Sequence, residues 1–378
     1  MNAFASRALD VQDDGTTAPW AGRLLAGTTV ALLGLGLLSV YSASSFLAES
    51  RGLPSEHYLT DQLAHVGVGV LALFVGRLVD YRMWRRLAWP VMAATVAALV
   101  VLVLPWTTEV APRLNGARRW LHVGVAFQPS EVAKFAVVAW TAALAVKKQD
   151  RLHSFRYGML PFLLVVGLVC ALVLAEPHLS AAMILAVLAG IVLFTAGARL
   201  GHFLLLGGVS LPLLWDQVVN TGYRMSRVAA FLEPASNQAG YQLRQSLIAV
   251  GSGGLFGVGY GESRQKLYYL PEPQNDFIFP IIAEEWGFVG SALILVLFLG
   301  WTLLGLRIAA SAPDLFGRLL GVGLTAVVAV GAFAHVGVTL GLLPTTGVNL
   351  PFVSAGGTHL VLAMGCTGVL LNIASQRG

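Results

Sequence analysis

One aspartate stands where an apolar segment begins, a place in which a carboxylate can do chemistry. Asp276 follows the proline-containing stretch 270–275 and precedes a long run of apolar residues. A carboxylate at such a boundary can act as a general base that takes a proton from a hydroxyl group. Aspartate before an apolar run is also a common helix N-cap. The sequence alone leaves both roles open for Asp276.

A glutamate and a lysine open a second apolar segment, in the stretch 128–134. Pro129 fits the first turn of a helix, and the i and i+3 spacing places Glu131 and Lys134 on one helix face. A charge within an apolar segment is costly unless it faces protein or water. Two interpretations remain open: an internal ion pair that fixes helix packing, or a cationic site that faces an outward cavity.

Further cations stand near Lys134 or at the start of the long segment 218–279. Arg119 lies shortly before the Glu131 segment, and Arg224 and Arg227 follow at helical spacing. Cations that converge in this way bind phosphate groups through charge-assisted hydrogen bonds. Each loop arginine could alternatively be an ordinary solvated charge. No metal-ligand spacing accompanies them, so a divalent cation such as Mg²⁺ or Mn²⁺ is left open.

Two adjacent glutamates and one serine complete the candidates. Glu284 and Glu285 lie inside the apolar segment after Asp276, where helix capping does not need them. Ser354 lies in a glycine-containing turn before the last apolar segment. We assign Glu285 and Ser354 to substrate binding. The glycine run 251–261 lacks the preceding strand and the following Lys-Ser/Thr of nucleotide-binding loops, so we interpret it as backbone bends that allow close approach.

The composition decides which class of protein these residues serve. Of the 378 residues, 24 are Lys or Arg and 19 are Asp or Glu, which makes 11% charged, whereas soluble globular proteins carry about 25%. The hydrophobic fraction is 56% and the mean hydropathy +0.74. These values exclude a soluble enzyme, a nucleic-acid binder, a disordered chain and a disulfide scaffold. The chain is predicted to be an integral membrane protein.

The apolar segments predict an all-α bundle of about ten transmembrane helices. A helix needs about 20 apolar residues to cross about 30 Å of hydrocarbon. Inside the bilayer only helices or closed barrels satisfy the backbone hydrogen bonds, and continuous apolar runs of this length are helical. The predicted spans lie near residues 24–45, 62–79, 87–104, 129–146, 158–175, 179–196, 201–217, 280–306, 318–342 and 353–374.

The distribution of Lys and Arg predicts the orientation. An even number of spans places both termini on one side, and most Lys and Arg residues of the short loops fall on that side, which is therefore cytoplasmic. Residues 218–279 then form a long, partly helical extracytoplasmic loop, with an amphipathic helix over 241–250 on the membrane face. Residues 1–22 are predicted as a flexible cytoplasmic tail, and residues 23–378 as a single membrane domain.

These segments, in this order, resemble the SEDS family (shape, elongation, division and sporulation proteins). The resemblance extends from Leu24 to Ile373. Its main elements are the stretches 41–44, 115–120, 128–134, 251–261, 270–285 and 351–357. Residues 195–199, 263–266 and 343–345 resemble the division members of the family more than the elongation members.

The resemblance implies a peptidoglycan glycosyltransferase that polymerises lipid II at the division septum of the inner (cytoplasmic) membrane. It also implies a class B penicillin-binding protein as transpeptidase partner, together with other divisome membrane proteins. Asp276 is then the base, Arg119, Lys134, Arg224 and Arg227 are candidates for binding the donor diphosphate, and Glu131 orients Lys134. A lipid II flippase and a catalytically inert division scaffold are the alternatives.

Overall fold

The computed structural model describes residues 18–113, 117–233 and 238–376. In this part of the chain nine helices are long and apolar enough to cross a membrane, and α7 is a shorter apolar helix of the same bundle. The prediction of about ten spans is confirmed, and the chain is a multi-pass membrane protein. The ten helices are α2 (Ala18–Ser50), α3 (His57–Leu78), α4 (Tyr81–Val103), α5 (Pro129–Lys147), α6 (Leu160–Ala175), α7 (Leu179–Thr195), α8 (Leu200–Val219), α11 (Ile278–Ala310), α12 (Leu315–Thr339) and α13 (Gly357–Ser375).

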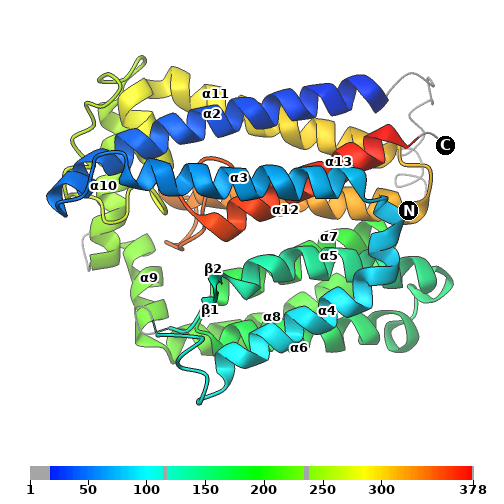
Figure 1. The fold of residues 1–378 in the computed structure, drawn as a ribbon. Coiled ribbons are helices and arrows are strands. Elements are labelled where there is room, and N and C mark those ends of the chain that lie inside the picture. Colours follow the sequence, from blue (N-terminus) through cyan, green and yellow to red (C-terminus); the bar gives the residue numbers. More distant parts are fainter. Residues whose placement is uncertain (1–17, 114–116, 234–237, 377–378) are drawn as a thin grey trace.

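The helices lie side by side with their long axes in roughly the same direction (Figure 1). The start of α2 and the end of α13 lie at the same end of the bundle, as an even number of spans requires. Helix α3 packs on α13, and α11 packs on both α2 and α12. A short 3₁₀ turn, η1 (Gln149–Arg151), and a π-helical turn, η2 (Phe155–Met159), connect α5 to α6.

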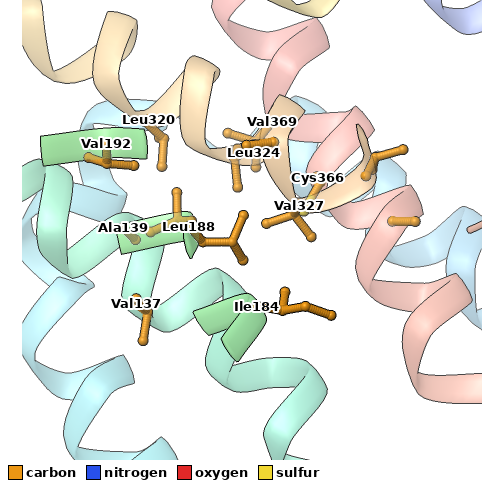
Figure 2. Close-up of a cluster of buried hydrophobic side chains, with 14 of the residues drawn as sticks. Val137, Ala139, Ile184, Leu188, Val192, Leu320, Leu324, Val327, Cys366 and Val369 are labelled. Carbon is orange, nitrogen blue, oxygen red and sulfur yellow. The ribbon is translucent and has the colours of Figure 1, made fainter. Parts of the chain in front are cut away.

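The core lies where α5, α7, α12 and α13 meet. Figure 2 shows aliphatic side chains of all four helices in contact, among them Leu188 of α7 and Leu324 of α12, which are both fully buried. Almost every residue on the inner faces of α5 and α12 is buried, whereas α8 has no buried residue in its described span. The rigid part of the molecule is therefore this four-helix centre, and the candidate site lies beside it.

The long connection between α8 and α11 is partly helical, as predicted. It holds α9 (Gly222–Leu232) and α10 (Gln238–Ser252), and α10 includes the predicted helix 241–250. Helix α10 packs on α9, α11 and α12. Both short helices lie at the end of the bundle opposite the termini (Figure 1).

The all-α bundle is confirmed, and one short hairpin that was not predicted precedes α5. Strands β1 (Leu121–Val123) and β2 (Val125–Phe127) pair antiparallel, with His122 opposite Ala126. Gly124 joins them with φ +77°, a left-handed conformation that glycine adopts without strain. Strands of three residues are too short to show the alternating pattern by which a strand is predicted. The hairpin fixes the chain immediately before α5.

Two predicted boundaries are wrong. Helix α2 begins at Ala18, so residues 18–22 are helical instead of part of a tail; the rest of the predicted tail, residues 1–17, lies outside the described residues. The last helix begins at Gly357, later than the predicted start at residue 353. Phe352 (φ 65°) and Gly356 (φ 148°) have backbone angles that no helix accepts, so the chain turns there before α13.

Candidate functional site

Asp276 lies in the turn before α11 and does not cap this helix. Helix α11 begins at Ile278, its N-cap residue is Phe277, and no side chain makes a cap hydrogen bond. The capping alternative for Asp276 is therefore wrong. A role for its carboxylate in chemistry remains, because helix capping does not explain its position.

The backbone immediately before Asp276 is held by the turn that precedes α13. The Ser354 hydroxyl donates to the carbonyl of Asn275 at 2.7 Å and accepts from the Leu350 amide at 2.9 Å. The amide of Ala355 donates to the carbonyl of Gln274 at 2.9 Å. Ser354 is fully buried. The structure therefore places Ser354 against the segment that contains Asp276, where its hydroxyl group holds the backbone of the preceding residue.

A glutamine that the sequence analysis missed holds this turn from α3. The Gln62 side chain donates to the carbonyl of Ser354 at 3.2 Å and accepts from the Gly356 amide at 3.0 Å. Gln62 is buried. A lone amide in an apolar segment is a detectable signal, since a buried polar side chain needs hydrogen-bond partners.

The loop between α12 and α13 lies directly against the Asp276 carboxylate. A Cβ atom added to Gly347 would lie 3.1 Å from Oδ2 of Asp276. Arg227 of α9 donates to the carbonyl of Thr345 in the same loop at 2.8 Å. Burial raises the pKa of Asp276 to about 6, although Arg227 and Arg119 lower it. A carboxylate with this pKa is deprotonated at neutral pH and can still accept a proton readily.

The Glu131–Lys134 pair is an ion pair and also lines a pocket, so both open interpretations apply in part. Lys134 Nζ lies 2.6 Å from Glu131 Oε1. The side chains are 11% and 13% exposed. The pocket lies beside the core, because Ile184 and Val327, which are labelled in Figure 2, also line it. Its polar lining consists of Gln128, Glu131, Lys134, His178, Asn349 and His359.

The turn between α6 and α7 borders this pocket. Arg119 donates to the backbone carbonyls of Glu176 and Pro177 at 3.4 and 2.6 Å, and so ties the chain before the hairpin to this turn. Nδ1 of His178 lies 3.5 Å from the side-chain nitrogen Nε2 of Gln128. Burial lowers the pKa of His178 to about 3 and raises the pKa of Glu176 to about 8. Both side chains are therefore uncharged at neutral pH.

The predicted cations differ in where they lie. The charges of both Arg119 and Arg227 act on Asp276 and on His178, so these two arginines converge near the predicted base. Arg224 instead donates to the carbonyl and the side-chain oxygen of Gln217, at 3.1 and 2.9 Å, where α8 ends. Arg119 and Arg227 thus lie within electrostatic range of Asp276, whereas the printed hydrogen bonds of Arg224 are to Gln217 at the end of α8.

Glu285 lies in a different buried cluster. Its carboxylate pairs with Lys266 at 2.9 Å and accepts from the Ser42 hydroxyl at 2.6 and 2.8 Å. Glu284 accepts from the hydroxyl of Ser263. In the glycine run, a Cβ atom at Gly257 would come within 2.1 Å of the carbonyl oxygen of Glu285, so the predicted close approach is to helix α11. The two glutamates anchor the segment 257–266 on α11.

A metal site is not evident in the part of the chain that the structure describes, because no three His, Cys, Asp or Glu side chains converge there. The divalent cation left open by the sequence thus has no ligand set among these residues. Besides Gln62 and Gly347, the sequence analysis also missed His359, Asn349 and Lys266. All of them lie in apolar segments or in loops whose neighbours only the fold reveals.

Comparison with known proteins identifies the family. Residues 23–378 match the model of the cell cycle proteins FtsW, RodA and SpoVE. The chain belongs to the FtsW/RodA/SpoVE family. This confirms the SEDS resemblance. The FtsW/RodA/SpoVE match extends over the bundle and over the whole segment that contains Asp276.

Individual relatives are similar over nearly their whole length. Stage V sporulation protein E of Bacillus subtilis (strain 168) is 41% identical over 354 residues, which are 93% of this chain and 96% of that protein. A probable peptidoglycan glycosyltransferase FtsW of Trichlorobacter lovleyi is 39% identical over 349 residues, which are 92% of this chain and 91% of that protein. The relatives thus include sporulation and division members of the FtsW/RodA/SpoVE family.

Solved structures share the fold. One chain of a peptidoglycan synthase complex matches with a TM-score of 0.78 and 26% identity, over 96% of this chain and 99% of that chain. The crystal structure of the rod shape determining protein RodA of Thermus thermophilus matches with a TM-score of 0.69 and 27% identity, over 96% and 98% of the two chains. The helical bundle described above is therefore the FtsW/RodA/SpoVE fold.

Proposed function

We propose that this protein is a peptidoglycan glycosyltransferase that polymerises lipid II into glycan strands. The observation that carries the proposal is Asp276, a carboxylate whose pKa burial raises to about 6 and on which the charges of Arg119 and Arg227 act. A base and cations side by side are what transfer of a sugar from a diphosphate requires. The names of the relatives, among them probable peptidoglycan glycosyltransferases, support this assignment.

The reaction assigns a part to each group. Asp276 accepts the proton of the acceptor sugar's hydroxyl while that oxygen forms a bond to the anomeric carbon of the donor. The bond between this carbon and the diphosphate oxygen breaks, and the diphosphate leaves with the bonding electrons. Arg119 and Arg227 stabilise the negative charge that develops on it. Ser354 and Gln62 are positioning residues, since they hold the backbone next to Asp276.

The proposal includes the location and the partner. The excess of Lys and Arg in the short loops on one side orients both termini toward the cytoplasm, so Asp276, Arg119 and Arg227 face the outer side of the membrane. We assign the protein to the inner membrane, at the septum of a dividing cell. A class B penicillin-binding protein would cross-link the strands, and other divisome membrane proteins would accompany it. One structural relative is part of a peptidoglycan synthase complex, which supports a partner of this kind.

One experiment separates the proposal from its two alternatives. The purified full chain is incubated with labelled lipid II in detergent and, in parallel, reconstituted in vesicles. A glycosyltransferase makes polymer, and the Asp276→Asn protein does not. Movement of the lipid head group across the vesicle membrane without polymer would instead indicate a flippase. Neither polymer nor movement would indicate a catalytically inert scaffold.

A further inference from the structure

The pocket lined by Glu131 and Lys134 is small. Its cavity volume is about 50 Å³, a few times the roughly 10–15 Å³ that a single water molecule needs. Its inner wall is apolar and belongs to the packed core, through Ile184 and Val327. Space of this size suits one small functional group of a substrate better than a diphosphate.

The charges in the pocket also disfavour a diphosphate. Lys134 and Glu131 neutralise each other across 2.6 Å. The other carboxylate oxygen, Glu131 Oε2, is buried and receives no hydrogen bond from any residue that the structure describes. An ionised carboxylate only accepts hydrogen bonds, so this oxygen repels phosphate oxygens and requires a donor such as an N–H or O–H group.

A matching donor lies in the same pocket. Asn349 Nδ2 lies 3.1 Å from His359 Nδ1, and the tautomer in which Nδ1 accepts this hydrogen bond carries its proton on Nε2. His359 Nε2 is buried and has no hydrogen-bond partner among the described residues. His359 is only 9% exposed. In that tautomer the pocket presents one unsatisfied acceptor, on Glu131, and one unsatisfied donor, on His359.

We propose that this pocket binds the acetamido group of a 2-acetamido sugar in the lipid-linked substrate. An acetamido group carries one N–H donor and one carbonyl acceptor, so its N–H matches Glu131 Oε2 and its carbonyl matches the N–H of His359 Nε2. This inference rests on the proposed function, which supplies a substrate with such sugars. It also assigns the diphosphate to Arg119 and Arg227 and not to Lys134.

The test compares three diphosphate-bearing probes for binding to the purified full chain in detergent. The probes are lipid II, a deoxy analogue of lipid II with hydrogen atoms in place of its acetamido groups, and undecaprenyl diphosphate, which has no sugar. A hydrogen bond to a charged group is worth a factor of about 10 to 100 in affinity. We expect the wild-type protein to bind lipid II tighter than the deoxy analogue by this factor.

Variants then assign the discrimination to the pocket. His359→Phe retains the ring volume and removes the donor, so it should discriminate less between lipid II and the deoxy analogue than the wild type does and keep its affinity for undecaprenyl diphosphate. The double variant Glu131→Met with Lys134→Met removes the acceptor without leaving an unpaired charge, and should behave in the same way. The control is His202→Phe, because His202 lies on α8 and does not line the pocket. It should retain the discrimination.

The outcomes separate the inference from the proposed function. Equal binding of lipid II and its deoxy analogue by a wild-type protein that polymerises lipid II would overturn the inference alone. If both pocket variants lost affinity for lipid II and for undecaprenyl diphosphate to the same extent, this would also overturn the inference, since the pocket would then bind the diphosphate. A wild-type protein that neither binds nor polymerises lipid II would overturn the proposed function and the inference with it.

Discussion

The molecule contains two buried glutamate–lysine pairs whose surroundings differ. Lys266 Nζ donates to Glu285 Oε1, to the Ser42 hydroxyl and to the carbonyl of Gly261, at 2.9, 3.0 and 2.6 Å. Both oxygens of Glu285 accept from Ser42. At the other pair, the only hydrogen bond of the Lys134 side chain to a described residue is the one to Glu131, and Glu131 Oε2 has none.

This difference separates a structural cluster from a binding site. An ammonium group has three donors, and at Lys266 all three have partners. The donors of Lys266 and the carboxylate oxygens of Glu285 all have partners, and the pair fixes the segment 257–266 on α11. A buried pair with unused acceptors and donors costs free energy unless a ligand satisfies them. We therefore place the Glu131–Lys134 pair with Asp276 in the proposed site.

The largest effect is expected at Asp276, where a substitution should reduce activity strongly and leave stability unchanged. Asp276→Asn retains the shape of the side chain and removes its basicity, so polymerisation of lipid II should fall by about 10²–10⁴-fold. Thermal stability in detergent should stay near that of the wild type, because Asp276 does not cap α11. Polymer assays with labelled lipid II check the first part, and melting curves check the second. Full activity in a folded variant would rule out the base assignment.

A substitution in the Glu285–Lys266 pair should have the opposite effect, a loss of stability. Glu285→Gln leaves the charge of Lys266 buried without its carboxylate, which should lower the free energy of unfolding by about 3–5 kcal/mol. The double change Glu285→Gln with Lys266→Met removes both charges and should restore most of the melting temperature. If Glu285 binds substrate, as the sequence suggested, the double variant will fold normally and polymerise poorly.

The Glu131–Lys134 pair should respond differently to the corresponding double change. Glu131→Gln with Lys134→Met again removes both charges, so the melting temperature should remain near that of the wild type. Polymerisation should nevertheless fall by about 10 to 100-fold, because a hydrogen bond to a charged group is lost. The measurement is the rate of polymer formation beside the melting temperature. Recovery of both quantities would mean that this pair is structural like the other one.

A smaller effect is expected from the support of Asp276. Ser354→Ala removes the hydrogen bond to the Asn275 carbonyl and leaves the buried Leu350 amide without its acceptor. The cost should be about 1–3 kcal/mol of stability. Activity should fall several-fold, since the carboxylate is less well positioned. Ser354→Thr retains the hydroxyl and serves as the comparison; equal loss in both variants would point to the space at this position instead of the hydrogen bonds.

The smallest effect concerns the pH dependence. The base form of Asp276 is the deprotonated one, so kcat/KM should rise as the pH increases through about 6. Because Arg227 lowers the pKa of Asp276, Arg227→Gln should move this rise toward higher pH. Arg224→Gln is the control from the same helix and should leave the midpoint in place. A midpoint that does not move in Arg227→Gln would show that Arg227 does not act on Asp276.

The sequence by itself determined the class of protein, the ten apolar spans and most of the candidate residues. Length and hydropathy of the spans are properties of each segment alone, because every backbone group in a bilayer must be satisfied within its own helix. The i and i+3 spacing of Glu131 and Lys134 likewise predicted their ion pair from local geometry. The hairpin before α5 escaped prediction because its strands are too short to show a pattern.

Only the tertiary structure decided which candidates lie together. Asp276 and Gly347 are distant in sequence but adjacent in the structure, and Glu131 of α5 and His359 of α13 line one pocket. The same holds for Glu285, whose neighbours Ser42 and Lys266 come from another helix and from the long connection. Whether every hydrogen-bonding group of a buried charged side chain has a partner depends on residues from other segments. No local sequence pattern indicates these residues.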